Sequence, residues 1–72
     1  TMFYFTKYAE KKFDILNKHK IYLRKDQIED ALKLPDKIIK KRKYFISHKD
    51  EVGVVWQKEN EAIKIITFYP IK

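Results

Sequence analysis

Residues 52–70 read VGVVWQKENEAIKIITFYP, two runs of β-branched and aromatic residues separated by the short polar segment KENE. Such runs favour β-strands, and a short polar connection between them is typical of a hairpin. We therefore predict strands over residues 52–58 and 62–69. Residues 42–48 have the same character and are joined to the next run by the polar segment HKDE, so they are predicted to form a third strand.

The first half of the chain follows helical spacing after a short apolar run. Residues 2–5 are predicted to form a strand, and Thr6 is suited to cap a helix expected over residues 7–18. A second helix is expected over residues 25–34, with Arg24 as a poor capping residue and Pro35 as its stop. The order β-α-α-β-β-β predicts an α+β fold, an antiparallel sheet covered on one face by two helices, in a single domain over residues 1–72.

Alternation along the predicted strands assigns their side chains to two faces of the sheet. In the last strand, one face receives Ile63, Ile65, Thr67 and Tyr69, and the other receives Lys64, Ile66 and Phe68. In the strand before it, Val52, Val54, Trp56 and Lys58 lie opposite Gly53, Val55 and Gln57. Neither face is purely polar, and two short helices cover only one of them. We therefore expect a partner on the other face, through the aromatic residues Trp56, Phe68 and Tyr69, with plain core packing as the alternative.

Positive charge is concentrated in the second half of the chain. The formal net charge is +7, and residues 1–36 carry eight Lys or Arg against six Asp or Glu, whereas residues 37–72 carry nine against four. Six of these cations lie within KIIKKRKYFISHK, residues 37–49. A basic surface attracts anionic partners, of which nucleic acid is the commonest, although lysine also solvates exposed faces. The residues expected to contact phosphates of RNA are Lys40, Lys41, Lys43, Lys49, Lys58 and Lys64.

The composition excludes most classes of catalytic site. A single glycine leaves no glycine-rich phosphate loop, and a chain without cysteine has neither a thiol nucleophile nor a thiolate zinc site. We expect no metal and no cofactor. No apolar run approaches the length of a membrane span, so we expect no membrane association and a cytoplasmic protein.

Metal-independent cleavage of RNA is the one chemistry that the residues leave open. Attack of a 2′-hydroxyl on the adjacent phosphate needs a base, an acid and cations, which His, Tyr and Arg supply. Arg42, Tyr44 and His48 recur at period two and are expected on one face of one strand. The sequence is therefore compatible both with a ribonuclease and with a binding module that performs no chemistry.

Three motifs, taken together, resemble a family of small prokaryotic domains of unknown function. FTKYAEKKF at residues 5–13 is similar to the family's opening F-T-x-H-A-x-x-R, and LRKDQIEDALKLPD at residues 23–36 is similar to its helix ending in x-x-P. The end of residues 52–70 is similar to its closing V-x-T-x-Y-P. The chain departs from the pattern at two positions, since Tyr8 and Lys12 stand where the family usually has histidine and arginine.

That family is similar in fold to the RelE and BrnT ribonuclease toxins of bacterial toxin–antitoxin pairs. The resemblance implies a toxin-like, RelE-like domain that binds and cleaves RNA and is neutralised by an antitoxin protein. The alternative is a non-catalytic module that binds nucleic acid, or that recruits a partner protein or a second copy of itself through its sheet face.

Overall fold

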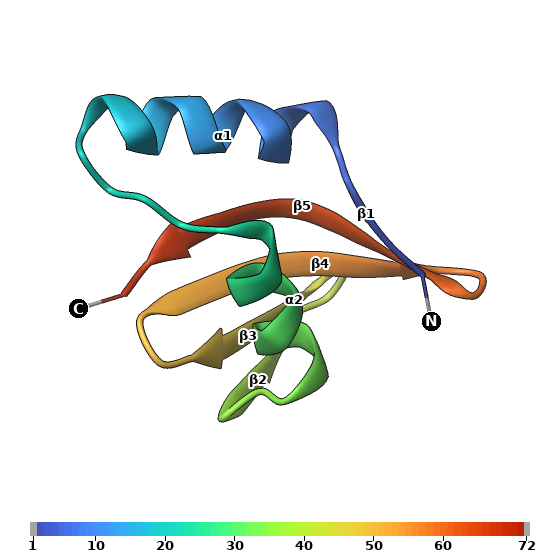
Figure 1. Ribbon diagram of the computed structural model, residues 1–72. Coiled ribbons are helices and arrows are strands. Elements are labelled where there is room, and N and C mark those ends of the chain that lie inside the picture. Colours follow the sequence, from blue (N-terminus) through green and yellow to red (C-terminus); the bar gives the residue numbers. More distant parts are fainter. Residues whose placement is uncertain (1, 72) are drawn as a thin grey trace.

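The computed structural model describes residues 2–71, and its elements confirm the predicted α+β class (Figure 1). Both predicted helices are present to within one residue, as are the first strand and the two long strands of the hairpin. In chain order the elements are β1 (Met2–Phe5), α1 (Lys7–Lys18), α2 (Lys25–Lys33), β2 (Lys37–Lys40), β3 (Phe45–Lys49), β4 (Val52–Glu59) and β5 (Ala62–Pro70).

The sheet has five strands in the order β1-β5-β4-β3-β2, which corrects the prediction in two respects. First, the sheet is mixed, because β1 pairs with β5 in parallel while the other neighbours are antiparallel. Second, the segment that we expected to be a connection before residue 42 contains the additional strand β2. The predicted strand over residues 42–48 begins only at Phe45, because the chain turns before it, with the Lys41 amide donating to the Tyr44 carbonyl at 2.8 Å.

A β-bulge in β5 changes which side chains share a face. Val55 pairs with Thr67 and Trp56 pairs with Ile65, so Ile66 is an extra residue without a partner on β4. An extra residue reverses the alternation beyond it. The predicted set of Ile63, Ile65, Thr67 and Tyr69 on one face is therefore wrong: Ile65 is buried on the helix side together with Phe68, whereas Thr67 and Tyr69 lie on the opposite side.

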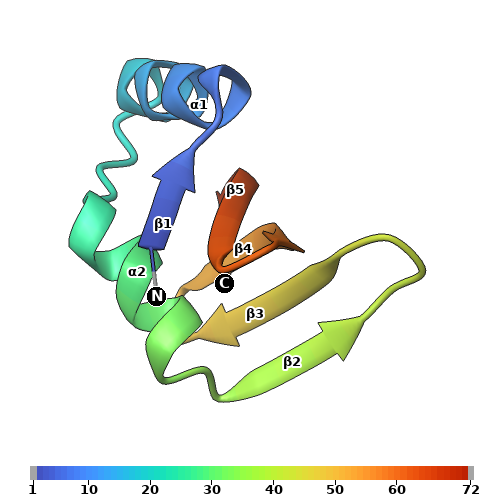
Figure 2. The same cartoon turned by 90° about the vertical axis from the view of Figure 1, so that its right-hand side faces the viewer.

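Both helices pack on the same face of the sheet (Figure 2). The apolar residues of this covered face and of the helices form one cluster, in which the Phe13 and Phe68 rings lie 4.4 Å apart between centroids. At the edge of the cluster Trp56 stacks on Phe45, and its indole nitrogen donates to the buried hydroxyl of Ser47 at 2.9 Å. The buried apolar residues are Ala9, Leu16, Ile28, Ala31, Val52, Val54, Ile65 and Phe68.

Polar contacts fix where the two helices start. Thr6 caps α1 as predicted, because its hydroxyl accepts from the Ala9 amide at 3.1 Å. The same hydroxyl donates to the carbonyls of Ile65 and Ile66 at the bulge, which ties the start of α1 to β5. At α2 the Arg24 amide donates to the side-chain oxygen of Gln27 at 2.8 Å, so Gln27 compensates for the poor capping residue. Neither helix combines the length and apolarity needed to cross a membrane.

Candidate functional site

The sheet face that points away from α1 and α2 has no covering element among residues 2–71, and we call it the open face. Residues paired across antiparallel strands point to the same side, so the side chains of this face form rows across the strands. The middle row is half-buried and mostly apolar. From one end of the strands to the other, the rows are Lys37, His48, Gly53 and Tyr69, then Ile39, Ile46, Val55 and Thr67, then Gln57 and Lys64.

The first row contains a hydrogen-bonded pair of side chains from two different strands. His48 Nε2 on β3 lies 3.2 Å from the Tyr69 hydroxyl on β5, and the two rings meet edge to face at 87°. Both side chains are half-buried. The pair therefore spans three strands, and each of the two side chains stays partly exposed.

Gly53 on β4 makes this pairing possible. It is the residue between His48 and Tyr69 in the row, and a Cβ built on it would lie only 2.6 Å from Cζ of Tyr69. No side chain fits at that distance unless the tyrosine ring moves, which explains why the only glycine of the chain occupies a strand position.

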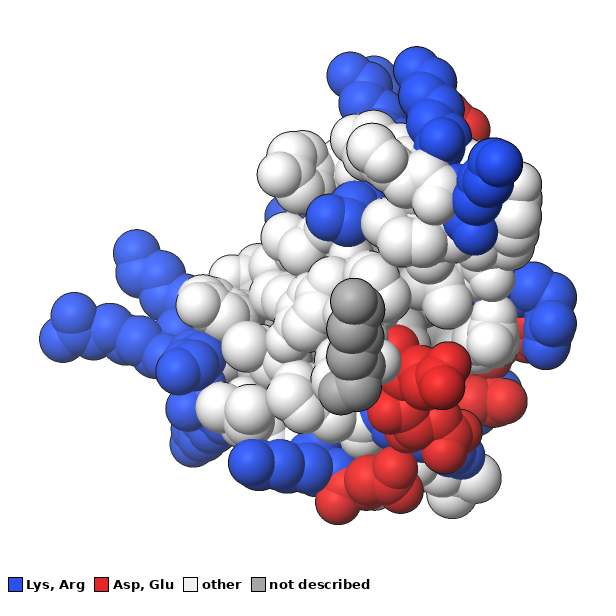
Figure 3. All heavy atoms as spheres, turned by 90° about the vertical axis from the view of Figure 1, so that its left-hand side faces the viewer, with Lys and Arg blue, Asp and Glu red and all other residues white. Residues whose placement is uncertain are grey.

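Four consecutive cations adjoin the other end of the open face. We call residues 40–43 the cationic turn, since they are Lys40, Lys41, Arg42 and Lys43 and all are exposed. Gln57 of the third row holds this turn, because its amide nitrogen donates to the Lys43 carbonyl at 2.8 Å. The β2–β3 turn projects from the body of the protein in Figure 2, and in the opposite view of Figure 3 Lys and Arg side chains extend from that same part.

The predicted catalytic residues do not come together. Arg42 lies in the turn and Tyr44 precedes the first residue of β3, so neither belongs to the strand that carries His48. Because a strand rises about 3.3 Å per residue, the three residues from Phe45 to His48 already separate His48 from the turn by about 10 Å. The group that contacts His48 is instead Tyr69, which the sequence pattern assigned to a partner interface.

The predicted partner interface is likewise divided between two faces. The side chain of Phe68 is fully buried in the core, so it is not available to a docking partner. Trp56 lies on the covered face against the same core. Only Tyr69 lies on the open face, because the bulge at Ile66 turns it there.

The predicted phosphate-binding lysines also divide into groups. Lys40, Lys41 and Lys43 belong to the cationic turn, and Lys64 lies in the third row of the open face. Lys49 lines a depression together with the acidic residues Asp30, Asp50 and Glu51, and Lys58 is on the covered side of β4. Sequence reasoning missed Lys37, which the unpredicted strand β2 places beside His48.

Lys64 belongs to a polar network that links β1 to the end of β4. The Tyr4 hydroxyl donates to the carboxylate of Glu59, whose other oxygen lies 3.6 Å from Lys64 Nζ. The bond to Glu59 raises the pKa of Tyr4, and that bond together with the charge of Lys64 lowers the pKa of Glu59. Because these groups are exposed, the network stabilises the fold only slightly.

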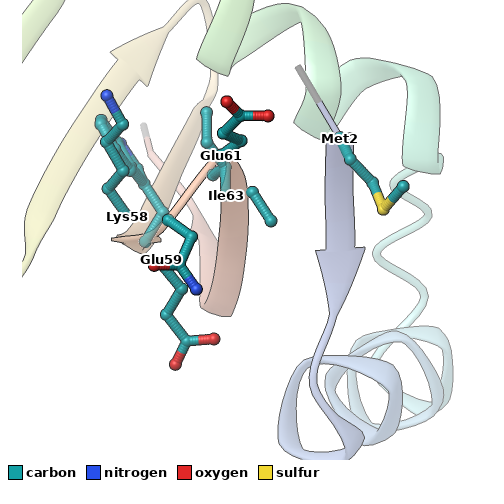
Figure 4. A pocket seen from close by; sticks show the side chains of 8 residues that line it. Met2, Lys58, Glu59, Glu61 and Ile63 are labelled. Atoms are coloured by element: carbon teal, nitrogen blue, oxygen red, sulfur yellow. The ribbon is translucent and has the colours of Figure 1, made fainter.

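A separate hollow lies at the end of the β4–β5 hairpin (Figure 4). It has a volume of about 830 Å³, and Met2 borders it across from Lys58, Glu61 and Ile63. Its lining mixes apolar, acidic and basic side chains. Gly53 lies near the other end of β4, so the hollow is separate from the His48–Tyr69 pair.

Among residues 2–71, no three His, Cys, Asp or Glu side chains are grouped so that they could hold a metal ion. Comparisons of the chain with protein-family models, with curated proteins and with solved structures found no match. The functional proposal is therefore based on the residues of the open face and of the cationic turn.

Proposed function

We propose that the protein binds single-stranded RNA on its open face, with phosphates held by the cationic turn. The observation that carries this proposal is the position of three consecutive exposed cations of the turn, Lys41, Arg42 and Lys43, at one end of a sheet face that no element of the described chain covers. Lys40, the fourth cation of the turn, pairs with Phe45 and belongs to the covered face. Lysine and arginine bind phosphates, whereas bases stack on aromatic and apolar side chains. Both kinds of group adjoin on this face.

Solvation is the competing explanation for the cations, because lysine at an edge hairpin also prevents edge-to-edge aggregation. The cationic turn differs from a merely solvated segment in that Gln57 connects it to the open face. A polyanion bound to the turn therefore lies beside the open face and can extend across the middle row, which contains Val55 and Thr67, to the row of Tyr69.

The test is the salt dependence of affinity for a labelled single-stranded RNA of about twelve nucleotides, followed by fluorescence anisotropy. One variant combines Lys41→Ala, Arg42→Ala and Lys43→Ala. The control combines Lys7→Ala, Lys11→Ala and Lys18→Ala on α1, which removes the same charge from exposed positions. Removal of one cation that binds a phosphate should flatten the slope of log K against log salt by about 0.7.

We expect the slope to flatten by up to about 2 in the turn variant, and to stay at the native value in the α1 variant. Equal flattening in both variants would mean that bulk charge, and not this turn, attracts the RNA. No binding of RNA by the native protein would end the proposal.

RNA cleavage is a second candidate, favoured by the contact between His48 and Tyr69 at 3.2 Å. Imidazole is the side chain that most often exchanges protons in catalysis near neutral pH. His48→Ala should then abolish cleavage in a gel assay and leave the thermal unfolding temperature nearly unchanged. Intact RNA after incubation with the native protein would exclude RNA cleavage as the function of this domain.

A partner protein is the alternative occupant of the open face, either an antitoxin that neutralises a toxin-like activity or a second copy of this chain. Its half-buried apolar row, Ile39, Ile46 and Val55, supports this alternative. Ile46→Lys places a charge in that row and should convert an assembly to monomer in light scattering, whereas a protein that is already a monomer would exclude self-association.

A further inference from the structure

The His48–Tyr69 pair has a defined hydrogen-bonding capacity left over for a ligand. If the Tyr69 hydroxyl donates to Nε2, the other ring nitrogen keeps its hydrogen and the phenolic oxygen can still accept. If Nε2 carries the hydrogen and donates, the phenolic hydrogen is free and the other ring nitrogen accepts. In either tautomer of the neutral pair the Tyr69 oxygen therefore keeps one free bonding position, an acceptor in the first case and a donor in the second, while the other ring nitrogen points away on the far side of the ring.

A hydroxyl group is the ligand that can bond to the Tyr69 oxygen in either case, because it both donates and accepts. We propose that the pair binds the 2′-hydroxyl of a ribose and thereby makes the open face prefer RNA to DNA. This inference rests on the proposed binding of single-stranded RNA, and it identifies the residues that recognise the sugar. The 2′-hydroxyl is both donor and acceptor, and it is the group by which a protein distinguishes the two nucleic acids.

The surroundings of the pair fit a nucleotide. Lys37 is the partner of His48 in the row, is exposed, and supplies a cation for the adjoining phosphate. Thr67 and Val55 of the next row provide a half-buried surface on which a base can lie. The pair is thus bordered by charge on one side and by apolar surface on the other.

Gly53 acts as a positioning residue for this contact. Packing of an aromatic ring over a strand glycine also stabilises sheets, so the ring of Tyr69 alone does not demonstrate recognition. Two substitutions separate these roles. Tyr69→Phe keeps the ring over Gly53 and removes the hydroxyl, whereas Gly53→Ala places a Cβ where the far end of the tyrosine ring lies and forces the ring away from His48.

The experiment compares three labelled twelve-nucleotide probes of uridine that differ only at the 2′ position: hydroxyl, hydrogen and O-methyl. Dissociation constants are measured at one fixed pH for all probes and variants. A gel of the recovered RNA verifies that it stays intact. The control is Tyr22→Phe, which removes the hydroxyl of an exposed tyrosine in the connection between α1 and α2.

We expect the native protein and Tyr22→Phe to bind the ribose probe about two- to tenfold more tightly than the deoxyribose probe, as for one half-exposed hydrogen bond. The O-methyl probe, which cannot donate, should lie between them or match DNA. Tyr69→Phe and Gly53→Ala should bring the ratio near one while the affinity for DNA changes little.

Ring placement is verified without any ligand by NMR. The Gly53 Hα resonances should be shifted upfield by the tyrosine ring in the native protein and in a Tyr69→Phe variant, and should be absent from that region in Tyr69→Leu. Equal affinities of the native protein for the ribose and deoxyribose probes, or a ribose preference retained by Tyr69→Phe, would overturn the inference and leave the proposed function standing. Failure to bind any of the three probes would overturn both.

Discussion

The two faces of the sheet differ in what satisfies their side chains. On the covered face the chain completes its own contacts, since Val54 and Phe68 are fully buried and the hydroxyl of Ser47 accepts from Trp56. On the open face the side chains stay half-exposed, and His48 and Tyr69 bond to each other while keeping further hydrogen-bonding capacity. The covered face accounts for the stability of the fold, and the open face is the surface to which we assign the proposed binding of RNA.

Phe68 and Tyr69 give the largest contrast, because they are adjacent in β5 and point to opposite faces. Phe68→Ala should cost about 3–5 kcal/mol of unfolding free energy, as for other buried aromatic residues. Tyr69→Ala should cost about 1 kcal/mol, since a half-exposed ring loses only part of its transfer free energy. Urea unfolding followed by far-ultraviolet circular dichroism measures both. Similar costs would mean that the open face is a second core and not a binding surface.

Thr6 provides a smaller effect, which rests on the hydrogen bonds of its hydroxyl to the start of α1 and to the bulge. Thr6→Val keeps the shape of the side chain but removes the cap of α1 and the bonds to the bulge, and should cost about 1–2 kcal/mol. Thr67→Val on the open face is the matched control and should change stability by less than about 0.5 kcal/mol. Equal effects in urea unfolding would contradict the assignment of Thr6 as the anchor of the bulge.

Tyr4 and Glu59 give the smallest effect, which is visible only in the dependence of stability on pH. The lowered pKa of Glu59 stabilises the fold above the usual range of glutamate, and this contribution is lost as pH falls through the folded-state value. The raised pKa of Tyr4 stabilises the fold below the usual range of tyrosine, and this contribution is lost as pH rises through the folded-state value. Tyr4→Phe should therefore flatten the thermal stability profile at both its acidic and its alkaline ends.

Tyr22→Phe serves as the control for this profile, because its hydroxyl belongs to an exposed residue outside the network. A profile of Tyr4→Phe that matches the control at both ends would show that the bond between Tyr4 and Glu59 has no influence on folding.

Local signals were sufficient to predict most elements of the fold. Thr6 and Pro35 mark the start of α1 and the end of α2, and the β-branched runs on either side of KENE form β4 and β5. These signals depend on neighbouring residues alone, so they can be interpreted without knowledge of the tertiary structure. The parallel pairing of β1 with β5 joins residues about sixty positions apart, and no local pattern encodes it.

The candidate site was less predictable, because one residue changed its geometry. Strict alternation cannot anticipate the extra residue Ile66, and without it Tyr69 is assigned to the same face as Ile65. The strand β2 was not predicted, because four residues between a proline and a run of cations resemble a connection. For the same reason the position of Lys37 beside His48 was not predicted. The single glycine at position 53 was the one available signal, because a glycine inside a strand often marks the close approach of another group.

The central claim is that the open face, and not the helical side, meets the ligand, and NMR titration of the ¹⁵N-labelled protein with single-stranded RNA tests it most directly. We predict that amide resonances of the cationic turn, Ile46, His48 and Tyr69 shift progressively with added RNA, while those of Ile28, Ala31 and Val54 stay in place. Shifts confined to α1 and α2, with the open face unaffected, would contradict the claim.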